Sequence, residues 1–306
     1  MEKIKLGKSG LLVPPIALGC MRLAGAERKQ ADAFLHTALE LELNFFDHAD
    51  IYGGGACERV FGEMIKDAGV RREDLILQSK CAIVPGKMYD FSKEHILSAV
   101  DGSLKRLGTD YLDVLLLHRP DALMEPEEVA EAFDTLEKSG KVRHFGVSNE
   151  DPYTMELLQS ALHQPICANQ LQMSLTNATM IAQPMNTNIC DGLNPVLDNG
   201  VLNYCRLHNI TIQTWSPFQY GFFEGVFIGS EKHPKLNAKL DELAEKYNVT
   251  NTAIALAWIL RHPAKMQSVT GTINPKRLRD CAAALDITLA REDWYALYLA
   301  AGYRLP

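Results

Sequence analysis

Four residues of types that can transfer or stabilise a proton stand at the ends of apolar segments. Asp47 and Tyr52 lie in the stretch FFDHADIYGGG at 45–55, Lys80 ends the run LILQSK, and His118 ends YLDVLLLH. Burying an unpaired charge is costly, so an ordinary core rejects such side chains. We therefore expect the four to meet one another in a site.

Together these residues make a self-consistent proton donor. A free tyrosine has a pKa of about 10, too high for an efficient acid at neutral pH. A neighbouring Lys80 ammonium favours the phenolate and lowers that pKa, and Asp47 keeps the lysine charged. His118 can hydrogen-bond a substrate oxygen. The group would protonate a carbonyl oxygen as negative charge develops on it, and it implies a bound reductant because it has no electron source.

The elements that position these residues follow a regular alternation. Eight short, nearly continuous apolar runs alternate with helical patterns, at 13–19, 44–49, 75–80, 111–118, 142–149, 166–172, 210–216 and 266–271. Such runs indicate parallel strands buried on both faces. One helical pattern begins after Ser92 as N-cap and ends at Gly108 as C-cap.

This alternation predicts an α/β fold, a (β/α)8 TIM barrel formed by one domain over residues 1–306. We expect an N-terminal hairpin and an extra C-terminal helix over AREDWYALYLAAG. The alternative, a doubly wound sheet, needs a nucleotide fingerprint after its first strand, and the chain has no G-x-G-x-x-G. Two longer segments, 173–199 and 217–234, each follow a strand, so we expect both to line a pocket on the top face with Met21, Tyr52 and Phe218.

Composition excludes several classes of function. The chain has 306 residues and a net charge of −7, without a run of Lys or Arg, so nucleic acid and anionic membranes are poor candidates for partners. No apolar segment approaches the ~20 residues of a membrane helix. The seven cysteines are widely spaced without a C-x-x-C, which indicates free thiols and a cytoplasmic protein. No H-E-x-x-H or Cys/His cluster indicates a metal site.

Seven stretches in order carry a resemblance to a known family. They are FFDHADIYG, SKC, YLDVLLLH, FGVSN, NQLQ, TWSPF and GTINPKR. Over residues 4–285 the chain resembles the aldo-keto reductase superfamily, and HADIYGG, LLHRPD and SGKVRHFGVSN are similar to its microbial short-loop branch.

The resemblance implies roles for individual residues. Asp47, Tyr52, Lys80 and His118 match the catalytic tetrad, with Tyr52 as general acid. The cofactor NADP(H), or NAD(H), is implied by five further groups. Gly19, Cys20, Met21 and Arg22 match the first loop; Ser148, Asn149 and Gln170 match the nicotinamide carboxamide site; Trp215 matches the ring-stacking aromatic; and Ser216, Phe218 and Gly221 match the pyrophosphate loop. Gly271, Thr272 and Arg277 match the 2′-phosphate site, where a guanidinium binds a phosphate well.

The expected activity is reduction of an aldehyde or ketone by an NADP-dependent enzyme, monomeric by the habit of the family. Many members have Lys at the position of Gly271, so the preference for NADPH over NADH stays open. Two alternatives remain. One is an NADP(H)-binding redox sensor or regulatory subunit with little turnover. The other is a barrel isomerase or lyase without nicotinamide, which would not need the residues of the cofactor site.

Overall fold

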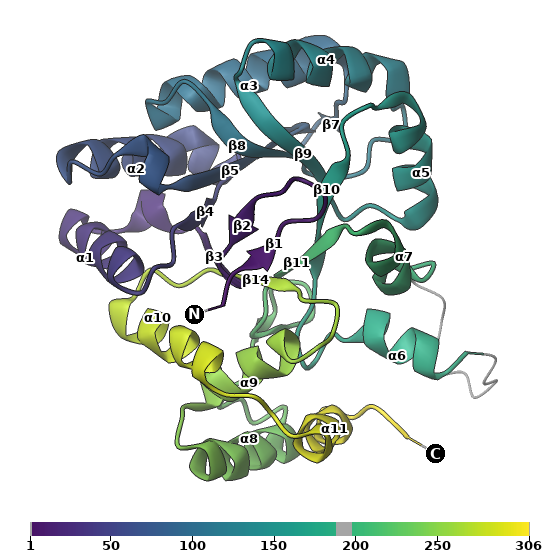
Figure 1. The fold of residues 1–306 in the computed structure, drawn as a ribbon. Helices are drawn as coiled ribbons and strands as arrows, with labels where there is room; N and C mark the ends of the chain where they lie inside the picture. The colour runs from purple at the N-terminus through teal and green to yellow at the C-terminus, as the bar shows by residue number, and fades with distance from the viewer. Residues whose placement is uncertain (1, 188–197, 306) are drawn as a thin grey trace.

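A closed barrel of eight parallel strands forms the centre of the computed structural model, which describes residues 2–187 and 198–305 (Figure 1). The strands neighbour one another in chain order. They are β3 (Ile16–Gly19), β4 (Phe45–Asp47), β5 (Ile76–Cys81), β8 (Leu112–Leu117), β9 (Val142–Ser148), β10 (Ile166–Gln172), β11 (Thr211–Trp215) and β14 (Gln267–Thr270). All eight predicted strands are confirmed.

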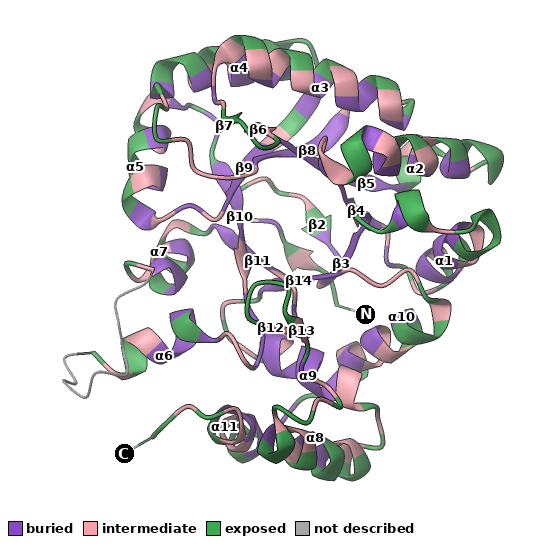
Figure 2. Cartoon of the chain, turned by 180° about the vertical axis from the view of Figure 1, so that it is seen from behind, coloured by how far each residue is buried: buried purple, intermediate pink, exposed green. Residues whose placement is uncertain are grey.

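The barrel strands are almost wholly buried, whereas most of the surrounding helices expose one side; α9 is the exception, because Ala253 to Ile259 are all buried (Figure 2). The helices are α1 (Arg28–Glu40), α2 (Ala56–Asp67), α3 (Lys93–Leu107), α4 (Pro126–Lys138), α5 (Pro152–Ala161), α6 (Thr179–Met185), α7 (Val201–His208), α8 (Pro234–Tyr247), α9 (Asn251–Leu260), α10 (Pro275–Ala282) and α11 (Arg291–Ala300). The predicted caps of α3 are confirmed. Ser92 accepts a hydrogen bond from the His95 N–H, and Gly108 takes the left-handed conformation that favours glycine.

The predicted N-terminal hairpin, β1 (Ile4–Lys5) with β2 (Leu12–Val13), closes the amino-terminal end of the barrel. Leu6 and Val13 are fully buried in a cluster with Phe45 and other residues of the barrel interior. Gly7 has a φ of +52°, and a Cβ there would overlap the Cys167 carbonyl oxygen. Only glycine therefore lets the hairpin seat this closely.

The expected C-terminal helix is α11, which packs beside α8 outside the ring of barrel helices (Figure 1). Lys246 of α8 donates to both carboxylate oxygens of Asp293 at 2.9 and 2.8 Å. The indoles of Trp258 and Trp294 stack with their centroids 4.9 Å apart. α11 thus covers a face of the helical layer.

The expectation for segment 173–199 is wrong in part, and residues 188–197 lie outside the described residues. Residues 173–187 contribute nothing to the wall of the main cavity. They support the hairpin of β12 (Gln219–Tyr220) and β13 (Gly225–Val226), because Ser174 Oγ and Thr176 Oγ1 both contact the Gln219 carbonyl, at 2.8 and 3.1 Å. Segment 217–234 does line the cavity, as expected.

The six cysteines within the described residues are free. In the same part of the chain no helix is long and apolar enough to cross a membrane, and no three His, Cys, Asp or Glu side chains gather as metal ligands.

Candidate active site

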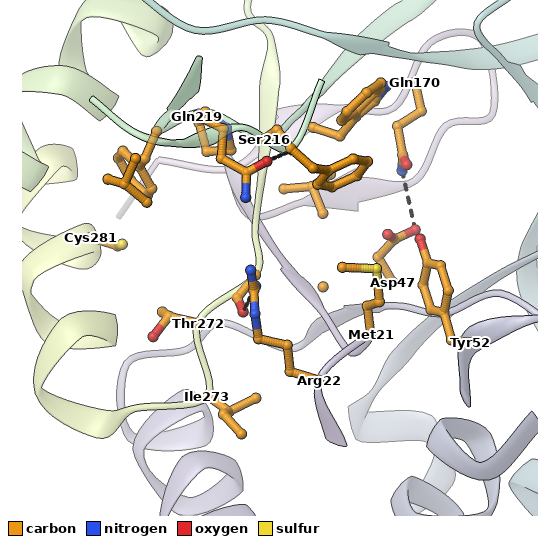
Figure 3. A pocket seen from close by; sticks show the side chains of 18 of the residues that line it. Met21, Arg22, Asp47, Tyr52, Gln170, Ser216, Gln219, Thr272, Ile273 and Cys281 are labelled. Carbon is orange, nitrogen blue, oxygen red and sulfur yellow. Dashed lines mark hydrogen bonds between the residues drawn. The ribbon is translucent and has the colours of Figure 1, made fainter. Parts of the chain in front are cut away.

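A cavity of 1070 Å³ opens at the carboxyl ends of the barrel strands. Of the residues expected in the site, fifteen line it: Gly19, Met21, Arg22, Asp47, Tyr52, His118, Ser148, Asn149, Gln170, Trp215, Ser216, Phe218, Gly271, Thr272 and Arg277 (Figure 3). The barrel topology therefore gathers side chains from loops and strands spread over more than 250 residues.

Three of the expected residues do not line the cavity. Lys80 is fully buried beneath Tyr52 and Asp47. Cys20 is fully buried, with its thiol 3.5 Å from the Leu18 carbonyl oxygen. Gly221 lies on the exposed tip of the 219–226 hairpin, and its carbonyl accepts a hydrogen bond of 2.7 Å from Gln172 Nε2.

Lys80 connects the acid and the phenol at the base of the cavity. Its Nζ lies 2.8 Å from the Asp47 carboxylate, 2.7 Å from the His48 carbonyl oxygen and 3.2 Å from the Tyr52 hydroxyl. Burial alone would lower the pKa of Lys80, but Asp47 and Tyr52 together raise it above its usual value. The amine is therefore charged at neutral pH.

The pKa of Tyr52 is shifted in the direction opposite to the expected lowering. Burial raises the pKa of the Tyr52 phenol, and although Lys80 opposes this effect as expected, burial and the Asp47 charge outweigh it. The phenol consequently holds its proton at neutral pH in this state of the site. A tight turn positions it, since Gly53 and Gly54 directly after it have φ of 57° and 61°.

His118 faces Tyr52 across the cavity, with ring centroids 6.0 Å apart. Burial, followed by the charges of Lys80 and Arg119, lowers the pKa of His118 to about 2. The imidazole is therefore neutral at physiological pH. Its Nδ1 has no hydrogen-bond partner within the part of the chain that is described.

The residues expected at the nicotinamide carboxamide already bond to one another. Ser148 Oγ donates to the Gln170 carbonyl at 3.0 Å, and Asn149 Nδ2 donates to Ser148 Oγ at 2.8 Å. Asn149 Oδ1 accepts from Trp215 Nε1 at 3.1 Å. This network fixes the edge of Trp215, while the ring of Phe223 stacks against it at 5.8 Å.

The opposite end of the cavity offers groups that suit an anion. Thr272 and Arg277 flank the beginning of α10, where Asn274 caps the helix by accepting from the Arg277 N–H. Helix N-termini favour bound phosphate. Arg22 crosses to this side and donates to the Gly271 carbonyl, and a Cβ at 271 would overlap its Nη1. A side chain at 271 and this position of Arg22 are mutually exclusive.

Sequence reasoning missed two groups of residues at this site. Arg119 and Gln219 line the cavity, next to His118 and Phe218 in the sequence. Gln78 and Gln213 lie beneath it, where Gln78 donates to Asp47 and Gln213 accepts from Gln78. Gln78 and Gln213 could have been found because each is a polar side chain inside an apolar strand, the same signal that revealed Lys80.

Comparison with known proteins shows the family of the chain. The model of the Aldo/keto reductase family matches residues 15–298. The chain is 35% identical to a 6-dehydroglucose reductase of Agrobacterium fabrum over 314 residues, which cover 98% of each protein. It is 32% identical to the oxidoreductase YdhF of Escherichia coli over 317 residues, across 100% of both proteins.

Solved structures show the same likeness. A thermostable aldo-keto reductase in complex with the inhibitor epalrestat superposes with a TM-score of 0.79 at 28% identity, covering 98% of this chain and 100% of that one. The matching family model, the relatives and the barrel agree over nearly the full length. The chain belongs to the aldo/keto reductase family.

Proposed function

We propose that the protein reduces an aldehyde or ketone to an alcohol with NADPH, or with NADH, and that Tyr52 is the general acid. The observation that carries the proposal is the contact of Lys80 Nζ with both the Asp47 carboxylate and the Tyr52 hydroxyl, directly beneath the cavity. This arrangement gives a phenol that can release its proton next to a fixed positive charge.

The cavity fits a dinucleotide in size and in the character of its two ends. Its 1070 Å³ lies just above the range of ordinary ligand pockets, roughly 300–1,000 Å³, and suits a ligand larger than most. An aromatic platform at Trp215 suits a nicotinamide ring, and Thr272 with Arg277 suits a phosphate. A reduced nicotinamide bound there supplies the hydride for the carbonyl carbon.

The residues of the chain perform the proton chemistry. Tyr52 and the neutral His118 hydrogen-bond the carbonyl oxygen and hold it in one orientation. As negative charge develops on that oxygen, Tyr52 donates its proton, and Lys80 with Asp47 beneath it stabilises the phenolate that remains. The raised pKa of Tyr52 keeps the phenol protonated until that moment.

The proposed substrate is a small carbonyl compound, and a hydroxylated one is the specific candidate. Relatives at 35% identity are named 6-dehydroglucose reductases. Arg119 lines the cavity beside His118 and forms no hydrogen bond or ion pair with another described residue. The guanidinium lies over the Trp215 ring, 5.8 Å from its centroid, and its N–H groups can bind substrate hydroxyl groups, whereas Met21 and Phe218 offer apolar contacts.

The test is Tyr52→Phe, assayed with NADPH and NADH against a panel of aromatic aldehydes, ketones and hydroxylated carbonyl compounds. We expect the variant to lose carbonyl reduction by about 10²–10⁴-fold, the usual contribution of a general acid, with nearly unchanged cofactor affinity. Tyr89→Phe, at an exposed tyrosine, is the control. Unchanged turnover in Tyr52→Phe would refute the assigned acid. Cofactor binding without turnover by the unaltered protein would instead favour the regulatory subunit.

A further inference from the structure

Three fully buried glutamines occupy the interior of the barrel beneath the cavity. Gln78 lies on β5, Gln213 on β11 and Gln267 on β14, and none has exposed surface. A buried amide is costly unless its groups are hydrogen-bonded, and apolar side chains usually fill this space in a barrel. Their presence therefore requires an explanation beyond packing.

The three amides form a continuous chain of hydrogen bonds, which we call the glutamine ladder. Gln267 Nε2 donates to the Pro14 carbonyl oxygen at 2.8 Å, and Gln267 Oε1 accepts from Gln213 Nε2 at 2.8 Å. Gln213 Oε1 accepts from Gln78 Nε2 at 2.9 Å. Gln78 Nε2 also donates to Asp47 Oδ1 at 2.6 Å, which brings the ladder to the acid of the active site.

Gln170 joins the ladder at the same point. Its Nε2 lies 3.2 Å from Asp47 Oδ1 and 3.1 Å from Gln213 Oε1 (Figure 3). The Asp47 carboxylate thus receives hydrogen bonds from two amides in addition to Lys80. The Oε1 atom of Gln213 accepts hydrogen bonds from both of these amides, those of Gln78 and Gln170.

The two ends of the ladder fix the direction of every amide in it. A proline carbonyl can only accept a hydrogen bond, and an ionised carboxylate likewise has acceptors but no donor. Gln267 must therefore point its nitrogen at Pro14, and Gln78 must point its nitrogen at Asp47. Asp47 therefore meets hydrogen-bond donors on three sides, from Gln78, Gln170 and Lys80.

We propose that Gln78, held in place by Gln213, is a positioning residue that keeps the Asp47 carboxylate aimed at Lys80. The inference rests on the proposed function, in which Asp47 and Lys80 stabilise the Tyr52 phenolate. Without the Gln78 donor, the Asp47 carboxylate can turn away from Lys80.

The test compares Gln78→Met with Gln267→Met in the otherwise unaltered protein. Both replacements have nearly the length of glutamine and remove a ladder amide, but only Gln78 touches Asp47. The first readout is the NMR resonance of the Asp47 carboxyl carbon at neutral pH after ¹³C labelling of aspartate, assigned with Asp47→Asn. It needs neither cofactor nor turnover.

We expect the Asp47 carboxyl resonance in Gln78→Met to move away from its position in the unaltered protein, because the carboxylate loses one of its hydrogen-bond donors. Gln78→Asn, whose shorter amide falls short of Asp47, should show the same change and guards against misfolding of the first variant. Gln267→Met should leave the resonance in place while lowering the unfolding temperature to a similar extent.

The second readout is carbonyl reduction. Gln78→Met should lower kcat about tenfold or more with little change in either KM, because a misplaced Asp47 weakens stabilisation of the transition state rather than ligand binding. An equal change of the resonance in Gln78→Met and Gln267→Met, or no change in either Gln78 variant, would overturn the positioning role. A changed resonance in a protein that reduces no carbonyl compound would overturn the proposed function and leave the positioning of Asp47 standing.

Discussion

Burial of the Glu150 carboxyl group lowers the stability of the folded protein wherever this group is ionised in the unfolded chain. Glu150→Gln should remove this loss of stability. The side chain is only 2% exposed at the beginning of the segment between β9 and α5, and neither carboxylate oxygen has a hydrogen-bond partner among the described residues. Burial first, and then the charges of Asp151 and Asp121, raise the pKa of Glu150 to about 8 from a usual value of 4.5.

The sign of the pH dependence follows from this raised pKa. Below about pH 4.5 the carboxyl is protonated in both the folded and the unfolded chain, so it imposes no cost. Between about pH 4.5 and pH 8 the unfolded chain releases the proton and the folded chain retains it, so stability falls as pH rises. Above about pH 8 the cost is constant.

The magnitude can be worked from the same values. At about 1.36 kcal/mol per pKa unit the full difference is roughly 5 kcal/mol, as an upper bound. Entry of water and small side-chain movements reduce this difference. We therefore expect the stability of Glu150→Gln, relative to the unaltered protein, to rise by about 2–4 kcal/mol from pH 5 to pH 9. Denaturant unfolding at both values of pH measures this directly, with exposed Glu63→Gln as the control.

A gain of the same size at pH 5 and pH 9 would refute the reasoning, because an effect of shape or packing does not titrate. So would a loss of stability at pH 9. The assay is independent of cofactor and substrate, which separates this conclusion from the proposed function.

Two further predictions concern the cofactor and the packing of the helices. Arg277→Ala should weaken the binding of NADPH by about tenfold or more and the binding of NADH much less, because the proposed guanidinium–phosphate contact is lost. Titration of tryptophan fluorescence measures both affinities. Equal losses would place Arg277 away from the 2′-phosphate. Gly62→Ala should cost roughly 1–3 kcal/mol in denaturant unfolding, because its Cβ would lie 2.6 Å from the Leu107 carbonyl oxygen between α2 and α3. Gly102→Ala is the matched control, since there only the flexible guanidinium of Arg106 must move, and an equal cost in both variants would contradict the backbone clash.

The barrel could be predicted from the sequence because its signals are local. Each strand is a short apolar run, and the ends of α3 carry their own capping residues, Ser92 and Gly108. Once eight strands alternate with helices, parallel topology follows, and their carboxyl ends must meet. The contact of Lys80 with Asp47 and Tyr52 could be inferred for that reason, although the residues are distant in the sequence.

Other features depend on contacts that no local pattern contains. Burial outweighs Lys80 in setting the pKa of Tyr52, and burial is a property of the whole site. The approach of Arg22 to Gly271 joins loops 249 residues apart. The contact of residues 173–187 with the 219–226 hairpin could not be predicted either. Polar residues in a loop indicate that the loop lies at the surface, but they do not indicate which segment it contacts.

The N-terminal hairpin has a consequence for ligand binding in the proposed reaction. Since it closes the amino-terminal end of the barrel, whatever reaches Asp47 and Tyr52 enters and leaves through the mouth at the other end. In the proposed reaction the cofactor and the carbonyl compound would therefore share one entrance, and each bound molecule would restrict the passage of the other. A hairpin of a few residues at the far end of the barrel thus couples the binding of two ligands that it does not contact.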